Sequence, residues 1–205
     1  MRMKLDKLPI GLYDENVYVL HDNGHVLVVD PGACAKKILS CISKDEVLDG
    51  VILTHGHEDH TAACDDLCDL MDCPVYMHEA DYVLIDPNGS RHYGYDAPVY
   101  HEITWLSEGK MDIGSFPVTV YHTPGHTSGS VCVKYRNLLF SGDTLFASSI
   151  GRTDLFSGSE EEMISSLKFL MTLPKDLRVL PGHGPETTIG NEIMKNPYLY
   201  YLNVN

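Results

Sequence analysis

Three imidazoles and two carboxylates are gathered within six consecutive residues, from His55 to His60. Neutral imidazole is the usual protein ligand of zinc, and carboxylate oxygens bind the same class of divalent metals. Packed together without a cation, so many polar groups would leave like charges and buried acceptors unpaired. A solvated polar turn is the alternative interpretation, but the density of potential ligands favours a metal site.

Three later segments each offer one more potential ligand beside a glycine: His126 after Gly125, Asp143 after Gly142, and His183 after Gly182. Each segment adjoins a predicted strand, and glycine lets the backbone approach its neighbours closely. Four strand-end segments of a single ligand chemistry in a chain of 205 residues predict a shared metal centre.

The elements that must position these residues are short strands interspersed with helices. The apolar run 51–53 predicts a buried strand, and a loop leaving that strand must curl residues 55–60 inward. Asn23-Gly24 predicts a hairpin turn. Further strands are predicted over residues 4–7, 16–21, 25–30, 75–77, 118–121, 131–133, 138–140 and 178–180, and helices over residues 35–43, 61–71, 79–85 and 160–172. This order predicts two sheets covered by helices, with a long surface loop over residues 86–100.

The motif from His55 to His60 resembles the H-x-H-x-D-H signature of the metallo-β-lactamase superfamily without a gap. The later single His, the bridging Asp and the final His of that family match His126, Asp143 and His183. Within the superfamily the chain is similar to short glyoxalase II-like hydrolases, the type that lacks a C-terminal helical domain. The resemblance covers roughly residues 4–200, and its further matches lie in segments 143–146, 151–154, 181–185 and 187–190.

The resemblance implies an α/β fold, a four-layered αβ/βα sandwich in which residues 1–205 form one domain. The metal site would lie at one edge, between the two sheets. It also implies two divalent metal ions, with Zn²⁺ as the first expectation and iron or manganese as alternatives. The implied ligand sets are His55, His57 and His126 for the first ion, Asp59, His60 and His183 for the second, and Asp143 as the bridge.

The resemblance implies a hydrolase that cleaves a thioester, first of all S-lactoylglutathione, through a hydroxide shared by the two metals. Asp59 and Asp143 are the expected catalytic carboxylates. Asp rather than Cys or Ser at position 143, and His rather than Arg at position 60, argue against the common antibiotic-hydrolysing classes.

Three other functions remain open on this pattern. Another thioester or an ester would suit the same site. Iron-dependent sulfur dioxygenases of the superfamily use a related His, His and Asp set, although their last histidine usually lies in Pro-Ala-His-Asp, whereas residues 181–184 here are Pro-Gly-His-Gly. A non-catalytic metal-binding domain is the third, but no ligand of the pattern is missing.

Single residues around the pattern carry weaker expectations. Arg152 and Asp154 are expected to form a structural ion pair, with a substrate carboxylate as the other possible partner of Arg152. Glu58 is expected to be a solvated or supporting acid rather than the catalytic base. Thr54 and Thr144 adjoin ligands and are expected to hydrogen-bond to them.

Composition limits the partners and the compartment. A formal net charge of −14 argues against nucleic acid, because no basic face is available to displace phosphate counterions. No apolar run reaches the length of about 18 residues that a membrane span requires. The six cysteines form no C-x-x-C pair, and residues 1–6 do not resemble a secretory signal. We therefore expect a cytoplasmic protein with reduced thiols that acts on a small molecule, and the sequence gives no indication of its oligomeric state.

Overall fold

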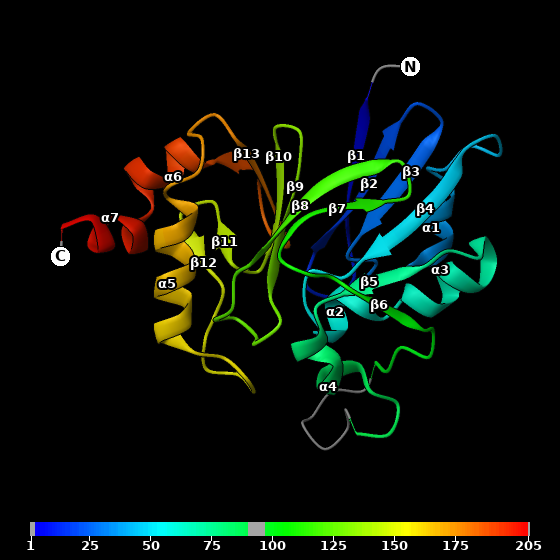
Figure 1. The fold of residues 1–205 in the computed structure, drawn as a ribbon, viewed down its shortest axis with the longest axis horizontal. Coiled ribbons are helices and arrows are strands. Elements are labelled where there is room, and N and C mark those ends of the chain that lie inside the picture. The colour runs from blue at the N-terminus through cyan, green and yellow to red at the C-terminus, as the bar shows by residue number, and fades with distance from the viewer. Residues whose placement is uncertain (1–2, 90–96, 205) are drawn as a thin grey trace.

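The computed structural model describes residues 3–89 and 97–204, and most of its strands form two six-stranded mixed sheets (Figure 1). In the first sheet, the strands follow one another in sequence order: β1 (Lys4–Ile10), β2 (Glu15–Asp22), β3 (His25–Val29), β4 (Val47–Ile52), β5 (Val75–Met77) and β6 (Ile103–Trp105). The first three strands are antiparallel, and β3 to β6 run parallel. The parallel strands β4 and β5 therefore direct their carboxyl ends to the same edge of the sheet.

The second sheet is mostly antiparallel. Its strands lie in the order β14 (Thr187–Thr188), β13 (Arg178–Pro181), β10 (Leu138–Gly142), β9 (Val131–Tyr135), β8 (Phe116–His122) and β7 (Gly109–Ile113). β10 and β13 pair in parallel, so the residues that follow both strands emerge at one edge. A small two-stranded ribbon, β11 (Leu145–Phe146) with β12 (Ser149–Ile150), follows β10.

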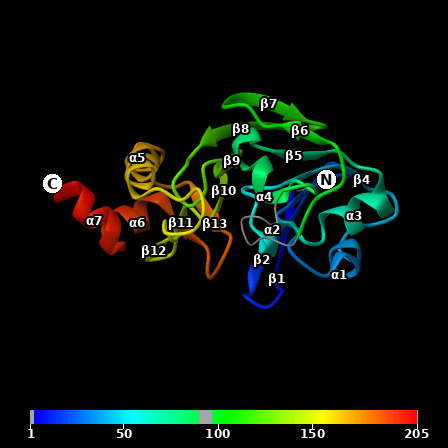
Figure 2. The same cartoon turned by 90° about the horizontal axis from the view of Figure 1, so that it is seen from below.

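Helices cover the outer faces of both sheets, as Figures 1 and 2 show. On the first sheet lie α1 (Ala35–Leu39) and α3 (Cys64–Met71); α5 (Glu160–Leu170), α6 (Ile189–Lys195) and α7 (Pro197–Val204) lie beside the second. Three short helices are close to the edge where the sheets meet: α2 (Glu58–Thr61), the 3₁₀ helix η1 (Glu79–Asp81) and α4 (Tyr82–Ile85). Within the described residues, no helix is long and apolar enough to cross a membrane.

Successive side chains of a strand point to opposite faces of its sheet, and the buried ones form three separate core clusters. In β3, Val26 and Val28 pack toward Ile38 and Leu67 of the helices, in the core cluster on the helix side of the first sheet. Leu27 of the same strand belongs to the cluster between the two sheets. A third cluster joins the second sheet to α5, where the predicted apolar face is buried: Met163, Ser166, Leu167 and Leu170. The expected four-layered arrangement, helix–sheet–sheet–helix, is thereby confirmed.

The structure changes one element that matters for the site. The helix predicted over residues 61–71 is divided into α2 and α3, because the Ala63 amide donates to the carbonyl oxygen of Pro31 at 2.9 Å. α2 starts three residues earlier than predicted and includes Asp59 and His60, which were expected in a loop. The predicted hairpin turn is present, with positive φ at Asn23 and Gly24. The expected surface loop 86–100 includes residues 90–96, which lie outside the described residues.

Candidate metal centre

The first group of potential ligands comes from two loops, each of which follows a strand of a different sheet. His55 and His57 follow β4 of the first sheet, and His126 follows β8 of the second. One ring nitrogen of each lies within 4.8 Å of the others, and the three side chains are buried. Nδ1 of His57 and Nε2 of His126 are 2.8 Å apart. Three imidazoles in this arrangement can bind one metal ion and leave a position for water or substrate.

A second group lies beside the first. Asp59 and His60 are presented by α2, and His183 follows β13. Oδ2 of Asp59 is 3.2 Å from Nε2 of His183 and 3.8 Å from Nε2 of His60. Asp59 and His60 are the second and third residues of this short helix, and both side chains reach the point where His183 lies.

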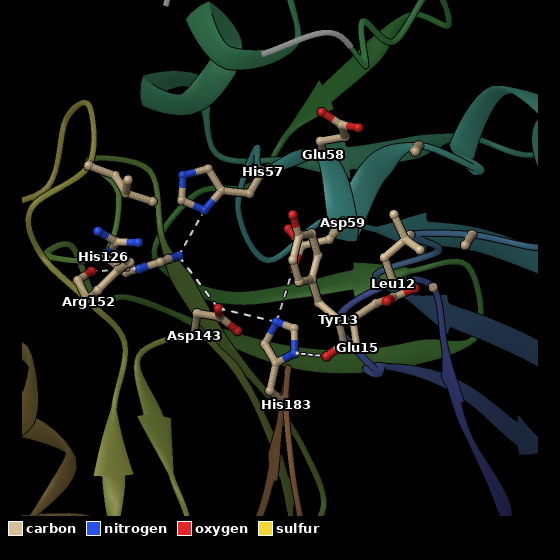
Figure 3. A pocket seen from close by; sticks show the side chains of 15 residues that line it. Leu12, Tyr13, Glu15, His57, Glu58, Asp59, His126, Asp143, Arg152 and His183 are labelled. Carbon is tan, nitrogen blue, oxygen red and sulfur yellow. Dashed lines mark hydrogen bonds and ion pairs between the residues drawn. The ribbon is translucent and has the colours of Figure 1, made fainter. Parts of the chain in front are cut away.

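Asp143 lies between the two groups, as Figure 3 shows for His126 and His183. Its Oδ2 is 3.6 Å from Nε2 of His126 and 3.6 Å from Nε2 of His183, and its Oδ1 is 3.5 Å from Nε2 of His60. A carboxylate in this position can serve both groups at once. The structure thus brings together all seven residues expected from the sequence, from both sheets.

Several buried atoms of this cluster fit a metal ion. Nε2 of His55, Nε2 of His60 and Oδ1 of Asp143 make no hydrogen bond to any other described residue. Leaving buried polar atoms in this state costs free energy that a bound cation would offset. Imidazole nitrogens and carboxylate oxygens are also the ligand atoms that first-row divalent metals accept. The residues present therefore suit a metal site.

Hydrogen bonds to backbone carbonyls fix which ring nitrogen is available at two of the histidines. Nδ1 of His126 donates to the carbonyl oxygen of Arg152 at 2.7 Å, and Nδ1 of His183 donates to that of Tyr13 at 3.1 Å. Nδ1 of His60 faces Oδ2 of Asp30 at 3.1 Å. Since carbonyl oxygens only accept, Nδ1 of His126 and Nδ1 of His183 carry a hydrogen, and Nε2 of each ring is directed to the cluster.

Electrostatics divide the buried imidazoles into two kinds. Burial and the neighbouring His60 and His57 hold the pKa of His55 well below its ordinary value, and burial and His126 lower the pKa of His57 to about 3. These rings stay neutral near pH 7, the form that binds metal. Burial also acts to lower the pKa of His60, but the carboxylates of Asp143 and Asp30 outweigh it and raise that pKa to about 10.

The acid of the second group is held ionised. Burial acts to raise the pKa of Asp59, but the hydrogen bond from His183 and the charge of His60 outweigh it, so this pKa is lowered. Asp59 therefore keeps its negative charge near neutral pH and is available as a ligand or as a hydrogen-bond acceptor.

A cavity of about 770 Å³ opens over the cluster. Its rim carries Leu12 and Tyr13 from the turn between β1 and β2, together with Glu58, Arg152 and Leu155. Leu12 is 96% exposed, so this apolar side chain has little contact in the described chain and is free to meet a ligand. The cavity is large enough for a small organic molecule.

The weaker expectations from the sequence have mixed outcomes. Arg152 forms the expected ion pair with Asp154, in a two-point arrangement at 2.7 and 2.8 Å. Thr54 lies 3.2 Å from Nδ1 of His55 through its hydroxyl, as expected. For Thr144 the expectation is wrong, because its hydroxyl bonds to Thr123 instead of a ligand. Glu58 is exposed at the cavity, in agreement with a solvated acid.

Asp30 and Glu15 are two of the buried acids near the cluster that were not predicted from the sequence. Asp30 accepts the amide and hydroxyl of Thr54, each at 2.7 Å, and also faces His60. Its position at a strand end before Pro31-Gly32 was the available signal. Glu15 is buried against Gly11 and Gly32, and burial raises the pKa of its carboxyl. Nothing in the spacing of the sequence distinguishes Glu15 from an ordinary strand residue.

Comparisons with known proteins agree over almost the whole chain. The family model described as Metallo-beta-lactamase superfamily matches residues 10–183. The probable metallo-hydrolase YqgX of Bacillus subtilis (strain 168) is 38% identical over 96% of this chain and 98% of its own length. Hydroxyacylglutathione hydrolase GloC of Haemophilus influenzae is 31% identical, again over 96% of this chain and 98% of its own.

Two solved structures are also similar to this chain over nearly its full length. The BLEG-1 B3 metallo-beta-lactamase superimposes with a TM-score of 0.87 at 35% identity, over 96% of this chain and 99% of that one. TTHA1623 in a di-iron-bound form gives a TM-score of 0.83 at 35% identity, over 95% and 100% of the two chains.

Proposed function

Because this chain belongs to the metallo-beta-lactamase superfamily of metallo-hydrolases, we propose that its His/Asp cluster hydrolyses thioesters, with S-lactoylglutathione as the first substrate to test. The observation that carries the proposal is the position of Asp143 between two groups of three ligands. The hydroxyacylglutathione hydrolase among its relatives, 31% identical over nearly the full length of both chains, supports the choice of substrate.

The proposed division of ligands follows the two groups. His55, His57 and His126 would hold one divalent ion, Asp59, His60 and His183 a second, and Asp143 would contact both. The ligand set suits zinc, and it suits iron or manganese as well. A structure 35% identical to this chain carries two irons, so the metal has to be determined by analysis of the purified protein.

The bound ions would supply a water of lowered pKa and polarise the substrate carbonyl. The residues of the chain have three other tasks. Asp59 is ionised and lines the cavity, so its Oδ2 can accept a hydrogen bond from the attacking water and fix the direction of that water. The hydrogen bonds from His126 and His183 to backbone carbonyls hold both rings in place. The residues that line the cavity, among them Leu12 and Tyr13, can contact the substrate.

The chemistry of the leaving group favours a thioester. Water adds to the acyl carbon, the carbon–sulfur bond breaks, and the electron pair leaves on sulfur to give an acid and a thiol. A thiol has a pKa of about 8.5, so the thiolate departs with little help from a proton donor. An amide would need a well-placed acid to protonate its nitrogen.

We also propose a reducing, cytoplasmic location, which the six free thiols of the chain support.

The test is the rate of S-lactoylglutathione hydrolysis by metal-loaded protein, compared with Asp143→Ala. We expect that variant to lose more than about 100-fold in kcat/KM, since outer partners of a metal ligand alone are worth about 10- to 100-fold. Asp22→Asn is the matched control: Asp22 is also buried, but it pairs with Tyr135 and Arg136 away from the cluster. Wild-type activity no higher than that of Asp143→Ala would reject the proposal.

β-Lactam hydrolysis is the second candidate: Asp at position 143 and His at position 60 argue against the common antibiotic-hydrolysing classes, but a B3 metallo-beta-lactamase superimposes on this chain at 35% identity. The same water attack would open a lactam ring at its amide bond. The chromogenic cephalosporin nitrocefin separates the two candidates. A kcat/KM for nitrocefin above that for S-lactoylglutathione would favour the lactamase.

A further inference from the structure

A buried carboxylate outside the ligand set joins the two loops of the first group. Asp81 ends η1 and is fully buried. Its Oδ2 accepts the amide hydrogen of Gly56 at 2.8 Å and the hydroxyl hydrogen of Thr127 at 2.7 Å. Its Oδ1 accepts the amide hydrogen of Gly129 at 2.6 Å. One side chain therefore receives three hydrogen bonds from segments that are some seventy positions apart in the chain.

Two of the three donors adjoin ligands, and the third, Gly129, lies three positions after His126. Gly56 lies between His55 and His57, and Thr127 directly follows His126. The carboxylate thus ties together the backbone that carries every ligand of the first group. A buried charge is stable only with such compensation, and loss of one partner leaves the others unpaired.

The packing around Asp81 leaves little freedom to the second loop. A Cβ atom on Gly129 would lie 2.6 Å from Cγ of Asp81, so only glycine allows this approach. The hydroxyl of Thr127 lies 2.7 Å from that of Ser130, which can donate to it while Thr127 donates to Asp81. The loop that carries His126 is therefore held through a chain of short hydrogen bonds that ends on one carboxylate.

The described hydrogen bonds of the Asp81 side chain reach only these two loops. α2, which carries Asp59 and His60, and the residues after β13 receive none of them. We propose that Asp81 is a positioning residue that sets the metal affinity of His55, His57 and His126 without setting that of Asp59, His60 and His183. This inference rests on the ligand division of the proposed function.

The test measures metal binding rather than turnover. Two parent variants isolate the groups: Asp59→Ala/His183→Ala keeps the first, and His57→Ala/His126→Ala keeps the second. Asp81→Asn is added to each, because the amide has nearly the shape of the carboxylate but turns an N–H group toward N–H or O–H donors. Zn²⁺ is titrated into metal-free protein in competition with a chromophoric chelator.

We expect Asp81→Asn to weaken Zn²⁺ binding about 10- to 100-fold in the parent that keeps the first group, the range for outer partners of metal ligands. In the other parent we expect a change below about twofold, as for independent sites. Equal weakening in both parents, or no weakening in the first, would overturn the inference and leave the ligand division standing. Parents that each fail to bind one Zn²⁺ would refute the division and, with it, the inference.

Asp22→Asn, added to both parents, controls for the loss of any buried carboxylate. If Asp81→Asn does not fold, Thr127→Val removes one of the three hydrogen bonds at nearly constant shape, and Thr127→Ser restores the hydroxyl. The inference then requires weaker Zn²⁺ binding by the first group in Thr127→Val and recovery in Thr127→Ser. Equal affinities in these two variants would contradict it.

Discussion

The histidines of the cluster differ in protonation state although they are the same type of residue. His55 and His57 have lowered pKa values and stay neutral, whereas the pKa of His60 is raised to about 10 by Asp143 and Asp30 against the effect of burial. In the metal-free protein, His60 therefore carries the proton that balances the nearby carboxylates. A metal ion bound there would take over this role.

This difference predicts how pH affects the metal-free protein. A histidine with a raised folded-state pKa stabilises the fold fully below its unfolded value of about 6.5. That contribution is lost as pH rises through about 10, the folded value of His60. Chemical unfolding of chelator-treated protein should therefore show stability falling over this window more steeply than in His60→Gln. Parallel curves for the two proteins would contradict the assignment of the proton to His60.

The seven candidate ligands could be predicted from the sequence because they lie in a dense motif or beside glycines at predicted strand ends, in a pattern that resembles a family signature. Asp30 and Asp81 could not be recognised in this way, since their partners are mainly backbone amides and hydroxyls. A surface aspartate and a buried one look alike in a sequence. Only the fold reveals that Asp81 meets Gly129, 48 positions away.

At the level of secondary-structure elements, glycines at the ends of strands let the residues of the cluster approach one another. Gly182 follows β13, and its amide donates to the carbonyl oxygen of Gly142 at 2.8 Å. A Cβ atom at Gly182 would collide with Oδ1 of Asp143 and lie 2.6 Å from Cε1 of His60. The absence of a side chain here is thus a condition for the approach of β10 to β13.

We therefore predict that Gly182→Ala lowers kcat/KM by at least about 100-fold, because a displacement of about 1 Å at a catalytic site can cost that much. Metal content, measured by elemental analysis, should fall as well. Gly24→Ala is the control: it has a φ of +84° with no atom near the added carbon, so it costs about 1–2 kcal/mol of stability away from the site. Equal activity of the two variants would contradict the steric account.

The elements differ in how far the sequence predicts them. β5 has the predicted bounds, because Val75 and Met77 are buried and Tyr76 between them is half-buried. β6 and β7 were missed, since both are mostly exposed or half-buried and lack an apolar run. The division of α2 from α3 depends on the bond from Ala63 to Pro31, a contact between segments that no local pattern encodes.

At the scale of the whole molecule, the site exists because the two sheets are held together at one edge. Asn16 of β2 donates its backbone amide to Gly182 and its side-chain amide to Pro181 and Gly184, at 2.7, 2.9 and 2.9 Å. The hydroxyl of Tyr18 adds a bond to Pro181 at 2.8 Å. These contacts hold the segment that carries His183 against the first sheet, and residues 55–60 follow a strand of that sheet.

We propose, above all, that the His/Asp cluster at the edge where the two sheets meet carries out hydrolysis. The most direct test incubates metal-loaded protein with S-lactoylglutathione in ¹⁸O-labelled water, with and without oxygen, and analyses the products by mass spectrometry. We expect equal rates in both conditions, one thiol for each acid, and one ¹⁸O in the new carboxylate. A reaction that requires oxygen, or thiol release no faster than with Asp143→Ala, would contradict this proposal.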